Sequence, residues 1–409
     1  MMGSKPRAGG PDERAWSLRD FILPLLAILL AVGAMGMVMH SSAIHPHSPW
    51  KLASKVLWKN ASVRPPVLLT ITILGWAGVV RVCRGAGMNL DLVLGGPTAA
   101  PAVTMHAAFV LLAVVLSAHA AHIYASEAAG LTWRPWLTCN LLLHAAAISL
   151  AFWPRGLSRA SRASLVATLV ESVVAPFAPV TFWHVIVADY LTSMAKAFAD
   201  LQLTVCLSGR ILALGADAAE GATAGDYVRT TQLWDDHHDT CAASSMNAVM
   251  LALPFWWRLM QCLRVYYDTR EQKNLWNALK YSTAFPLVYA GYLRRHEPSA
   301  AHDHLFVVAA VVQSSYCFVW DVVMDWGLPR FAEGLGSRAG SKCKPGMRDV
   351  LLVTKQKWVY AALCLANLCL RFAWTLSVFG GLPGRGGGMF FIELVEVARR
   401  TAWAVFRIE

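Results

Sequence analysis

Long apolar stretches separated by short polar segments occupy almost the whole chain of 409 residues. Each stretch is close to the roughly 20 residues that an α-helix needs to cross a bilayer, and most are bounded by proline, glycine or clustered charge. The pattern predicts an all-α, polytopic membrane protein with about ten transmembrane helices. Their expected ranges are 20–40, 66–83, 101–125, 134–153, 179–207, 243–263, 275–293, 303–323, 357–380 and 388–406.

The composition indicates that lipid is the solvent of this chain. Hydrophobic residues make up 56% and charged residues only 15%, whereas about a quarter of a soluble protein is charged. The net charge of +11 comes from basic residues dispersed over the connecting segments, which argues against a nucleic-acid partner. The nine cysteines form no CxxC pair and no zinc-type spacing, so we expect neither a metal site nor a cofactor.

Loop charge predicts the orientation of the helices. With residues 1–19 as a cytosolic tail, the loops assigned to the cytosol are basic and the outer loop 208–242 is acidic, as the positive-inside rule requires. The outer segment 40–65 is an exception to this rule because it holds four basic residues, although it also holds the glycosylation sequon Asn60-Ala61-Ser62. We divide the rest of the chain into 20–174, four helices with a basic cytosolic loop, and 175–409, a core of six helices.

Two cysteines bracket the acidic outer loop. Cys206 ends the helix expected at 179–207, and Cys241 precedes the helix expected at 243–263. Both positions fall on the oxidising side of the membrane, so we predict a disulfide that closes a loop of about 35 residues. Two unrelated thiols are the alternative, because sequence does not show their separation.

Ionisable residues lie deep inside several of the apolar stretches. An Asp, Lys or Arg at the centre of a membrane helix costs about 3 kcal/mol, so such residues need partners or a water-filled cavity. Five helices carry them at helical spacing. The residues are Asp189, Thr192, Ser193, Lys196 and Asp200; Lys280 and Tyr281; Asp321 and Asp325; Asn367, Arg371 and Trp374; and Glu396, Arg399, Arg400, Trp403 and Arg407.

Two interpretations of these residues are open. They form structural ion pairs, for example Glu396 with Arg399 or Arg400 one turn away. Alternatively, the positive charge that basic residues of the seventh, ninth and tenth helices add to the bundle favours an anionic guest in a medium of low dielectric constant. The planar fork of arginine suits phosphate or carboxylate oxygens, so we favour an anion pathway.

Several separated motifs resemble those of a known family, the EXS-domain membrane proteins, which include eukaryotic phosphate exporters. They occur in the expected order over roughly 175–409, and weaker similarity extends to Ala175–Phe177 and Ala188–Ser193. The main motifs are Phe255–Arg264 (FWWRLMQCLR), Tyr267–Thr269 (YDT), Asn277–Thr283 (NALKYST), Trp320–Asp321, Met324–Leu328 (MDWGL), Leu370–Thr375 (LRFAWT) and Glu396–Arg400 (EVARR) with Trp403 and Phe406-Arg407.

The resemblance implies transport of inorganic phosphate through the helical bundle, with no enzymatic activity. In the family, residues matching Asp321 and Glu396 balance charge near the pathway, and the residue matching Trp374 acts as a gate. The residues matching the family's phosphate site are Asp189, Thr192, Lys280, Tyr281, Arg371, Arg399 and Arg400. Thr192 and Ala195 replace an amide and a hydroxyl residue of the exporter, so the family's phosphate-site assignment is less secure for the residues of the fifth helix.

The family's exporters carry a cytosolic SPX sensor domain, whereas this chain begins its first helix within about twenty residues. We therefore expect the short, ER-retention-defective type, a protein of the Golgi membrane that returns phosphate to the cytosol; the plasma membrane or another endomembrane is the alternative. A non-transporting Golgi adaptor that binds glycosyltransferases or a vesicle coat is the second functional hypothesis. Its binding surface would be the cytosolic loops, and a homodimer is compatible with either role.

Two further possibilities have weaker support. His184 and Asp189 have the HxxxxD spacing of glycerolipid acyltransferases, but they lie inside an apolar helix and lack the companion motifs. The cluster Asp236-His237-His238-Asp239 resembles a metal site only in residue type, and in an acidic outer loop it is more simply a solvated turn.

Overall fold

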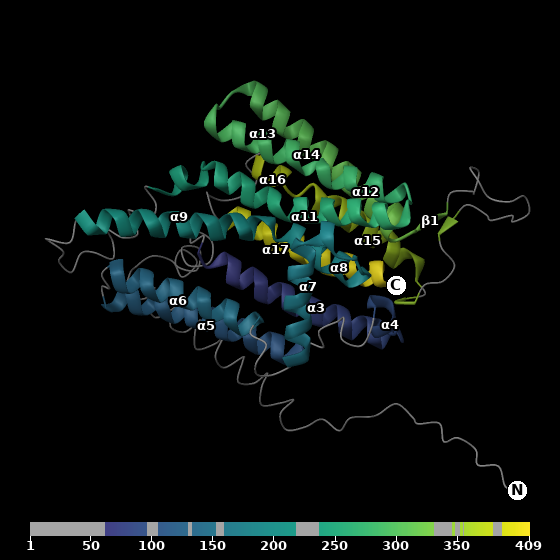
Figure 1. The fold of residues 1–409 in the computed structure, drawn as a ribbon, viewed down its shortest axis with the longest axis horizontal. Coiled ribbons are helices and arrows are strands. Elements are labelled where there is room, and N and C mark those ends of the chain that lie inside the picture. The colour runs from purple at the N-terminus through teal and green to yellow at the C-terminus, as the bar shows by residue number, and fades with distance from the viewer. Residues whose placement is uncertain are drawn as a thin grey trace, which may run out of the picture.

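The computed structural model describes residues 62–95, 105–129, 133–152, 159–217, 237–330, 346–347, 352–354, 356–378 and 387–409, and nearly all of them are helical (Figure 1). The tail 1–19, the helix expected at 20–40 and most of the acidic loop lie outside these residues. The helices are α3 (Arg64–Gly85), α4 (Leu90–Leu94), α5 (Met105–Ala129), α6 (Trp133–Phe152), α7 (Arg159–Val173), η2 (Ala175–Phe177), α8 (Phe182–Ser193), α9 (Ala195–Asp217), α11 (Ser245–Thr269), α12 (Lys273–Ser282), α13 (Ala284–His296), α14 (Ala300–Trp320), the π-helical turn η3 (Asp321–Asp325), α15 (Lys357–Arg371), α16 (Thr375–Val378) and α17 (Gly387–Ile408). The strands β1 (Pro329–Arg330) and β2 (Gly346–Met347) pair antiparallel.

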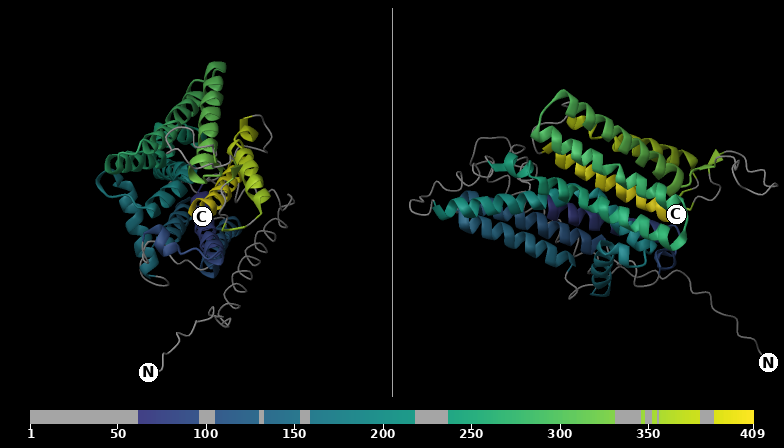
Figure 2. Two further views of the ribbon diagram at one scale, coloured as in Figure 1. Left: turned by 90° about the vertical axis from the view of Figure 1, so that its right-hand side faces the viewer. Right: turned by 45° about the horizontal axis from the view of Figure 1, so that its top comes forward.

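The long helices lie roughly alongside one another in an elongated bundle, whereas α7 runs across their direction (Figures 1 and 2). The C-terminal helix α17 lies in the middle of the bundle and packs against α3, α8 and α15. Helix α11 packs against α9 and α12, and α13 packs against α14. Helix α17 is thus the central element around which the rest of the core is arranged.

The all-α prediction is confirmed for the described residues, apart from the short strand pair. Helices α3, α5, α6, α11 and α17 coincide closely with five expected spans. Four others were expected as single helices, and each is interrupted. Among the described residues, Arg64–Gly85 and Ala300–Asp325 are long and apolar enough to cross a bilayer; the number of crossings stays a prediction.

Helix α7 was not expected, because its sequence belongs to the basic stretch that we assigned to a cytosolic loop. Its Glu171 accepts a hydrogen bond from His184 of α8 at 2.5 Å. His184 also completes the N-terminal cap of α8, where its Nδ1 accepts the Thr181 backbone N–H at 2.9 Å. The cap and the Glu171 contact together tie the transverse helix to the start of α8.

The disulfide that the sequence predicts is present. Cys206 of α9 is bonded to Cys241, and their Cα atoms are 5.9 Å apart. The bond links α9 to the segment just before α11, which packs along α9. It therefore closes one end of the α9–α11 pair, where the acidic loop would otherwise leave the two helices joined only by a long connection.

Close packing of α3 against α17 requires a small residue at Gly75. A Cβ atom added there would overlap Thr401 Oγ1 of α17, which itself donates a hydrogen bond to the Val397 carbonyl at 2.9 Å. Small residues at such crossings let helix backbones approach closely inside a membrane. At Gly78, one turn further along α3, an added Cβ would meet nothing within 4 Å.

We predict that Gly75→Ala destabilises the protein and that Gly78→Ala does not, although both remove a helix-interior glycine and should gain up to about 1 kcal/mol of helix propensity. Thermal unfolding in detergent, followed by size-exclusion chromatography, measures this. The double variant Gly75→Ala/Thr401→Ala should recover part of the loss because it removes the overlapping hydroxyl. Equal unfolding temperatures for the two alanine variants would contradict the close-contact interpretation.

Candidate functional site

Four interruptions of helical geometry lie beside residues that the sequence singles out. Helix α8 ends before Met194 and α9 begins after it, α12 and α13 are separated at Thr283, and residues 372–374 form turns between α15 and α16. The fourth interruption is the π-helical turn η3 at the end of α14. The neighbouring site residues are Ser193, Tyr281, Arg371 and Asp321. Because broken helices free backbone polar groups, such breaks in lipid require surrounding protein or water.

Asp189 of α8 connects three helices. Its Oδ1 accepts a hydrogen bond from Arg258 Nε of α11 at 2.8 Å and from the Tyr281 hydroxyl of α12 at 2.5 Å. Asp189 is 2% and Arg258 4% exposed, so this is a buried, charge-assisted contact. The stripe of polar residues expected on one fifth helix is therefore divided, with Asp189, Thr192 and Ser193 on α8 and Lys196 and Asp200 on α9.

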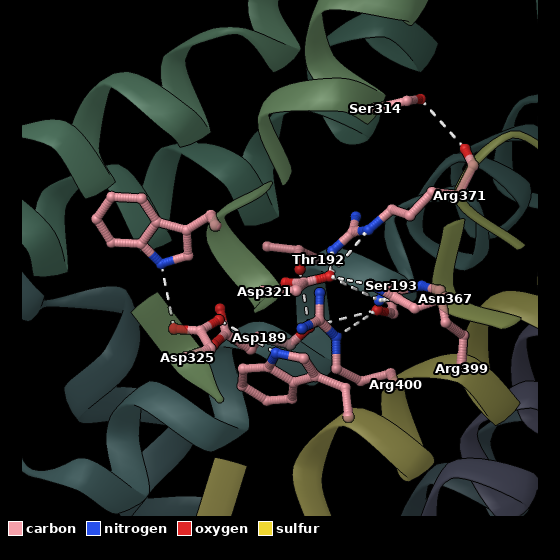
Figure 3. A network of polar contacts seen from close by, with 12 residues as sticks. Asp189, Thr192, Ser193, Ser314, Asp321, Asp325, Asn367, Arg371, Arg399 and Arg400 are labelled. Atoms are coloured by element: carbon pink, nitrogen blue, oxygen red, sulfur yellow. Dashed lines mark hydrogen bonds and ion pairs between the residues drawn. The ribbon is translucent and has the colours of Figure 1, made fainter. Parts of the chain in front are cut away.

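Asp321, the first residue of η3, forms a second buried centre (Figure 3). Its Oδ2 accepts from Asn367 at 3.1 Å, from Arg371 Nη2 at 2.7 Å and Nε at 3.2 Å, and from Arg399 Nη1 at 3.4 Å. Its Oδ1 is buried and accepts no hydrogen bond within the described residues. Arg371 has no acidic neighbour along the chain, but in space it is paired with Asp321, a contact that the sequence did not reveal.

The adjacent residues Arg399 and Arg400 of α17 have different surroundings. Arg399 donates to Glu396 through Nε at 2.7 Å and Nη2 at 2.6 Å, and to Asn367 Oδ1 at 3.0 Å. Arg400 donates through Nε to the Ser193 hydroxyl at 2.9 Å, and its guanidinium lies 4.4 Å from the Trp403 ring centroid. Glu396 therefore pairs with Arg399, and the 100° offset between consecutive helical residues explains the difference.

Within the part of the chain that the structure describes, two buried cations of this interior have no acidic partner. Among the described residues, no carboxylate oxygen lies within salt-bridge distance of Lys280 or Arg400, which are each 5% exposed. Lys280 Nζ instead lies 4.2 Å from the Tyr281 ring centroid and 5.2 Å from that of Trp320. Aromatic faces stabilise a cation only partly, by about 2 kcal/mol when desolvated. Both side chains thus retain capacity for an anion.

The interior as a whole carries excess positive charge. Its basic side chains outnumber its acidic ones by two, and this excess corresponds to the two cations without acidic partners. The basic members are Arg258, Lys280, Arg371, Arg399, Arg400 and Arg407, and the acidic members are Asp189, Asp321, Asp325 and Glu396.

The remaining predicted residues lie close by. Thr192 is buried, and its hydroxyl donates to the Asp189 carbonyl at 2.7 Å, which leaves the oxygen lone pairs as acceptors. Trp374 donates from its indole N–H to Ser314 at 3.1 Å, and Ser314 donates to the Arg371 carbonyl at 3.2 Å. Ser314 therefore links the Trp374 indole to the Arg371 backbone, so a movement of Trp374 would alter the contacts of Arg371.

Sequence reasoning did not assign two parts of the network. Arg258 lies within the motif FWWRLMQCLR, but the sequence indicates no function for it, because its partner Asp189 is distant in sequence. Asp325 accepts indole N–H groups from Trp320 and Trp403, both at 3.1 Å, and pairs with Arg407 at 3.6 Å. A signal for Arg258 existed in its position inside an apolar run, the same criterion that identified Arg371.

The geometry contradicts the acyltransferase interpretation. His184 contacts Glu171 and Thr181, and Asp189 contacts Arg258 and Tyr281, so the two residues do not form a catalytic pair. Asp236 of the acidic histidine cluster lies outside the described residues, and the described residues contain no group of three or more ligands able to hold a metal ion. His238 simply contacts Asp239 at 3.2 Å.

Comparison with known protein families shows that the EXS family model matches residues 61–409 of this chain. The chain belongs to the EXS family. The match begins well before residue 175, where the sequence motifs begin, and it includes α3 and every helix of the polar interior.

Curated relatives of this EXS chain include human solute carrier family 53 member 1, which is 30% identical over 264 residues, covering 61% of this chain and 35% of the relative. The Xenopus laevis xenotropic and polytropic retrovirus receptor 1 homolog is 31% identical over 263 residues, with the same coverage. The Dictyostelium discoideum SPX and EXS domain-containing protein 1 is 30% identical over 275 residues, 64% of this chain and 26% of the relative. The aligned region spans about a third or less of these longer proteins. The human relative is named as a solute carrier.

We predict that Arg258→Met lowers the free energy of unfolding by about 3–5 kcal/mol, because it leaves the buried Asp189 carboxylate without its cation. Asp189→Asn combined with Arg258→Met should be less destabilised than Arg258→Met alone. Unfolding by denaturant in detergent micelles gives the coupling free energy by a double-mutant cycle.

The matched control is Lys273→Met, since Lys273 pairs with Glu271 at 2.9 Å while both side chains are more than half exposed. It should cost no more than about 1 kcal/mol. Equal losses in the buried and the exposed pair would show that Asp189 does not depend on Arg258.

Proposed function

We propose that this EXS protein transports inorganic phosphate across a membrane through the polar interior of its bundle. The observation that carries the proposal is the pair of buried cations, Lys280 and Arg400, that have no acidic partner among the described residues. In a medium of low dielectric constant such charges attract an anion strongly. The similarity to a protein named as a solute carrier supports a transported guest over a permanently bound one.

Phosphate is the anion that fits the donors best. Arg371 and Arg399 are oriented by Asp321 and Glu396, so their guanidinium forks are preorganised to share N–H groups with an oxyanion. We propose Asp189, Thr192, Lys280, Tyr281, Arg371, Arg399 and Arg400 as the phosphate-binding residues. Asp321 and Glu396 balance charge, and Trp374 gates the pathway.

The acidic residues in the site also favour phosphate over sulfate. A protonated phosphate carries a hydroxyl that can donate to a carboxylate, whereas sulfate at neutral pH carries none. Asp321 Oδ1 is buried and accepts no hydrogen bond within the described residues, so it is available for that contact. Sulfate is therefore a useful competitor in transport experiments.

The broken helices support a pathway near the middle of the membrane, because transporters commonly build their sites where helices are discontinuous. We propose ten crossings with both ends of the chain in the cytosol, and residence in the Golgi membrane. Phosphate flux into proteoliposomes that contain the purified protein tests the function. Flux above that of empty liposomes, with little competition by sulfate, is expected; a folded protein without flux would favour the non-transporting adaptor.

We predict that Arg400→Gln reduces phosphate flux by more than about tenfold while the protein keeps its stability, because no acidic partner is left uncompensated. Arg399→Gln should lose stability as well, since Glu396 and Asp321 then lose a buried cation. Flux per folded protein and thermal unfolding separate the two effects. If both neutral variants, alone and combined, transported phosphate normally, α17 would not line the pathway.

We predict that Arg371→Ala also reduces flux by more than about tenfold and that Arg371→Lys restores little of it, because an ammonium group lacks the bidentate geometry of guanidinium. Flux and phosphate binding by the purified variants measure this. The control is Arg294→Lys, which exchanges the same groups at a partly exposed position near the C-terminus of α13 and should transport normally. Full activity of Arg371→Lys would argue against direct contact between Arg371 and phosphate.

A further inference from the structure

A second buried acid site lies outside the proposed phosphate site, around Glu393 of α17. Glu393 is 6% exposed, and neither of its carboxylate oxygens makes a hydrogen bond in the described structure. Burying an ionised carboxylate with no hydrogen-bond donor is very unfavourable, whereas the protonated acid carries no net charge. The surroundings of Glu393 thus suit a carboxyl group that takes up a proton.

Its charged neighbours come from α9 and α3. They are Asp200 and Lys196 of α9 and Arg64 of α3. Asp200 is fully buried and accepts from Arg64 Nη1 at 3.2 Å and from Lys196 Nζ. Asp200 is therefore held by two cations, whereas Glu393 receives a hydrogen bond from neither.

The chemistry of this cluster fits a proton better than a metal ion. The described residues contain no group of three or more acidic, histidine or cysteine ligands, and two fixed cations would repel a further one. The side chain of Lys196 is 26% exposed, so the cluster is not fully enclosed beside Asp200.

Glu393 also lies on the same face of α17 as the proposed phosphate site. It precedes Glu396 by three residues and Arg400 by seven, which along a helix is about 10 Å. With Arg64, Lys196 and Asp200 charged, protonation of Glu393 changes the charge of the cluster from zero to +1. That change favours an anion nearby, so the proton and the anion promote each other's binding.

We propose that Glu393 is a proton-binding site through which phosphate transport is coupled to movement of a proton in the same direction. The coupling rests on the proposed phosphate transport, but proton binding at Glu393 does not.

The first experiment measures proton-coupled transport. In proteoliposomes with the membrane potential clamped by potassium and valinomycin, an inwardly directed pH gradient should drive phosphate accumulation by the wild-type protein. Glu393→Gln, which mimics the neutral acid, should lower gradient-driven accumulation by about tenfold while equilibrium phosphate exchange changes by less than about twofold. Glu297→Gln, an exposed acid at the end of α13, should behave as wild type.

Absence of any gradient effect in the wild-type protein overturns the proposal, and so does a wild-type response in Glu393→Gln. If wild type shows no phosphate exchange at all, the proposed function fails and the second experiment decides on proton binding. Dicyclohexylcarbodiimide modifies protonated carboxyl groups in apolar surroundings, and peptide mass spectrometry locates the adduct on wild-type protein. Modification of Glu393 that falls as pH rises supports the proton site; no modification of Glu393 at any pH overturns it.

Discussion

Two buried carboxylates, Asp189 and Asp321, impose the main constraint on this bundle, because each must be compensated by basic groups from other helices. Asp189 binds α8 to α11 and α12, and Asp321 binds η3 to α15 and α17. Since breaking one partner from a buried ion pair costs several kcal/mol, these contacts fix how the helices meet. The apolar surfaces around them, such as Trp76 against Trp183 at 4.9 Å between ring centroids, then fill the space that the charges define.

The broken helices follow from the same constraint. A continuous α-helix presents its side chains at a fixed angular spacing. The π-helical turn at Asp321 changes that spacing locally, as such turns commonly do at functional sites. Interruptions at Met194, at Thr283 and after Arg371 have a similar effect beside the other polar residues. Irregular backbone is thus concentrated where charge is concentrated.

Charge compensation is incomplete in two opposite ways. Within the described residues, Lys280 and Arg400 are cations without an acidic partner, and Glu393 is an acid without a hydrogen-bond donor. Each departure has a natural external partner, an anion for the cations and a proton for the acid. Arg400 and Glu393 both lie on α17, whereas Lys280 lies on α12, so one central helix connects the site that we propose for phosphate with the site that we propose for the proton.

The sequence by itself determined the helical class, the approximate positions of most described helices and most of the polar residues that gather in the interior, and it predicted the Cys206–Cys241 disulfide that the structure then confirmed. Apolar length, loop charge and the cost of buried charge are local properties that can be read along the chain. Family membership also followed from motifs visible in sequence. The transverse helix α7 escaped detection, because its short sequence, basic at the start, has no distinctive hydrophobic periodicity.

Only the tertiary structure decided which charges meet. The side-chain partners of Asp189 and Asp321 lie 46 to 92 residues away in the sequence, and no periodicity predicts such pairs. How the helices cross decides that Arg371 pairs with Asp321 and that Arg399 and Arg400 have separate surroundings. It also decides that the Glu393 carboxyl accepts no hydrogen bond among the described residues. The physical reason is that the cost of burying a charge is set by its own residue, whereas its compensation is set by whichever helix packs against it.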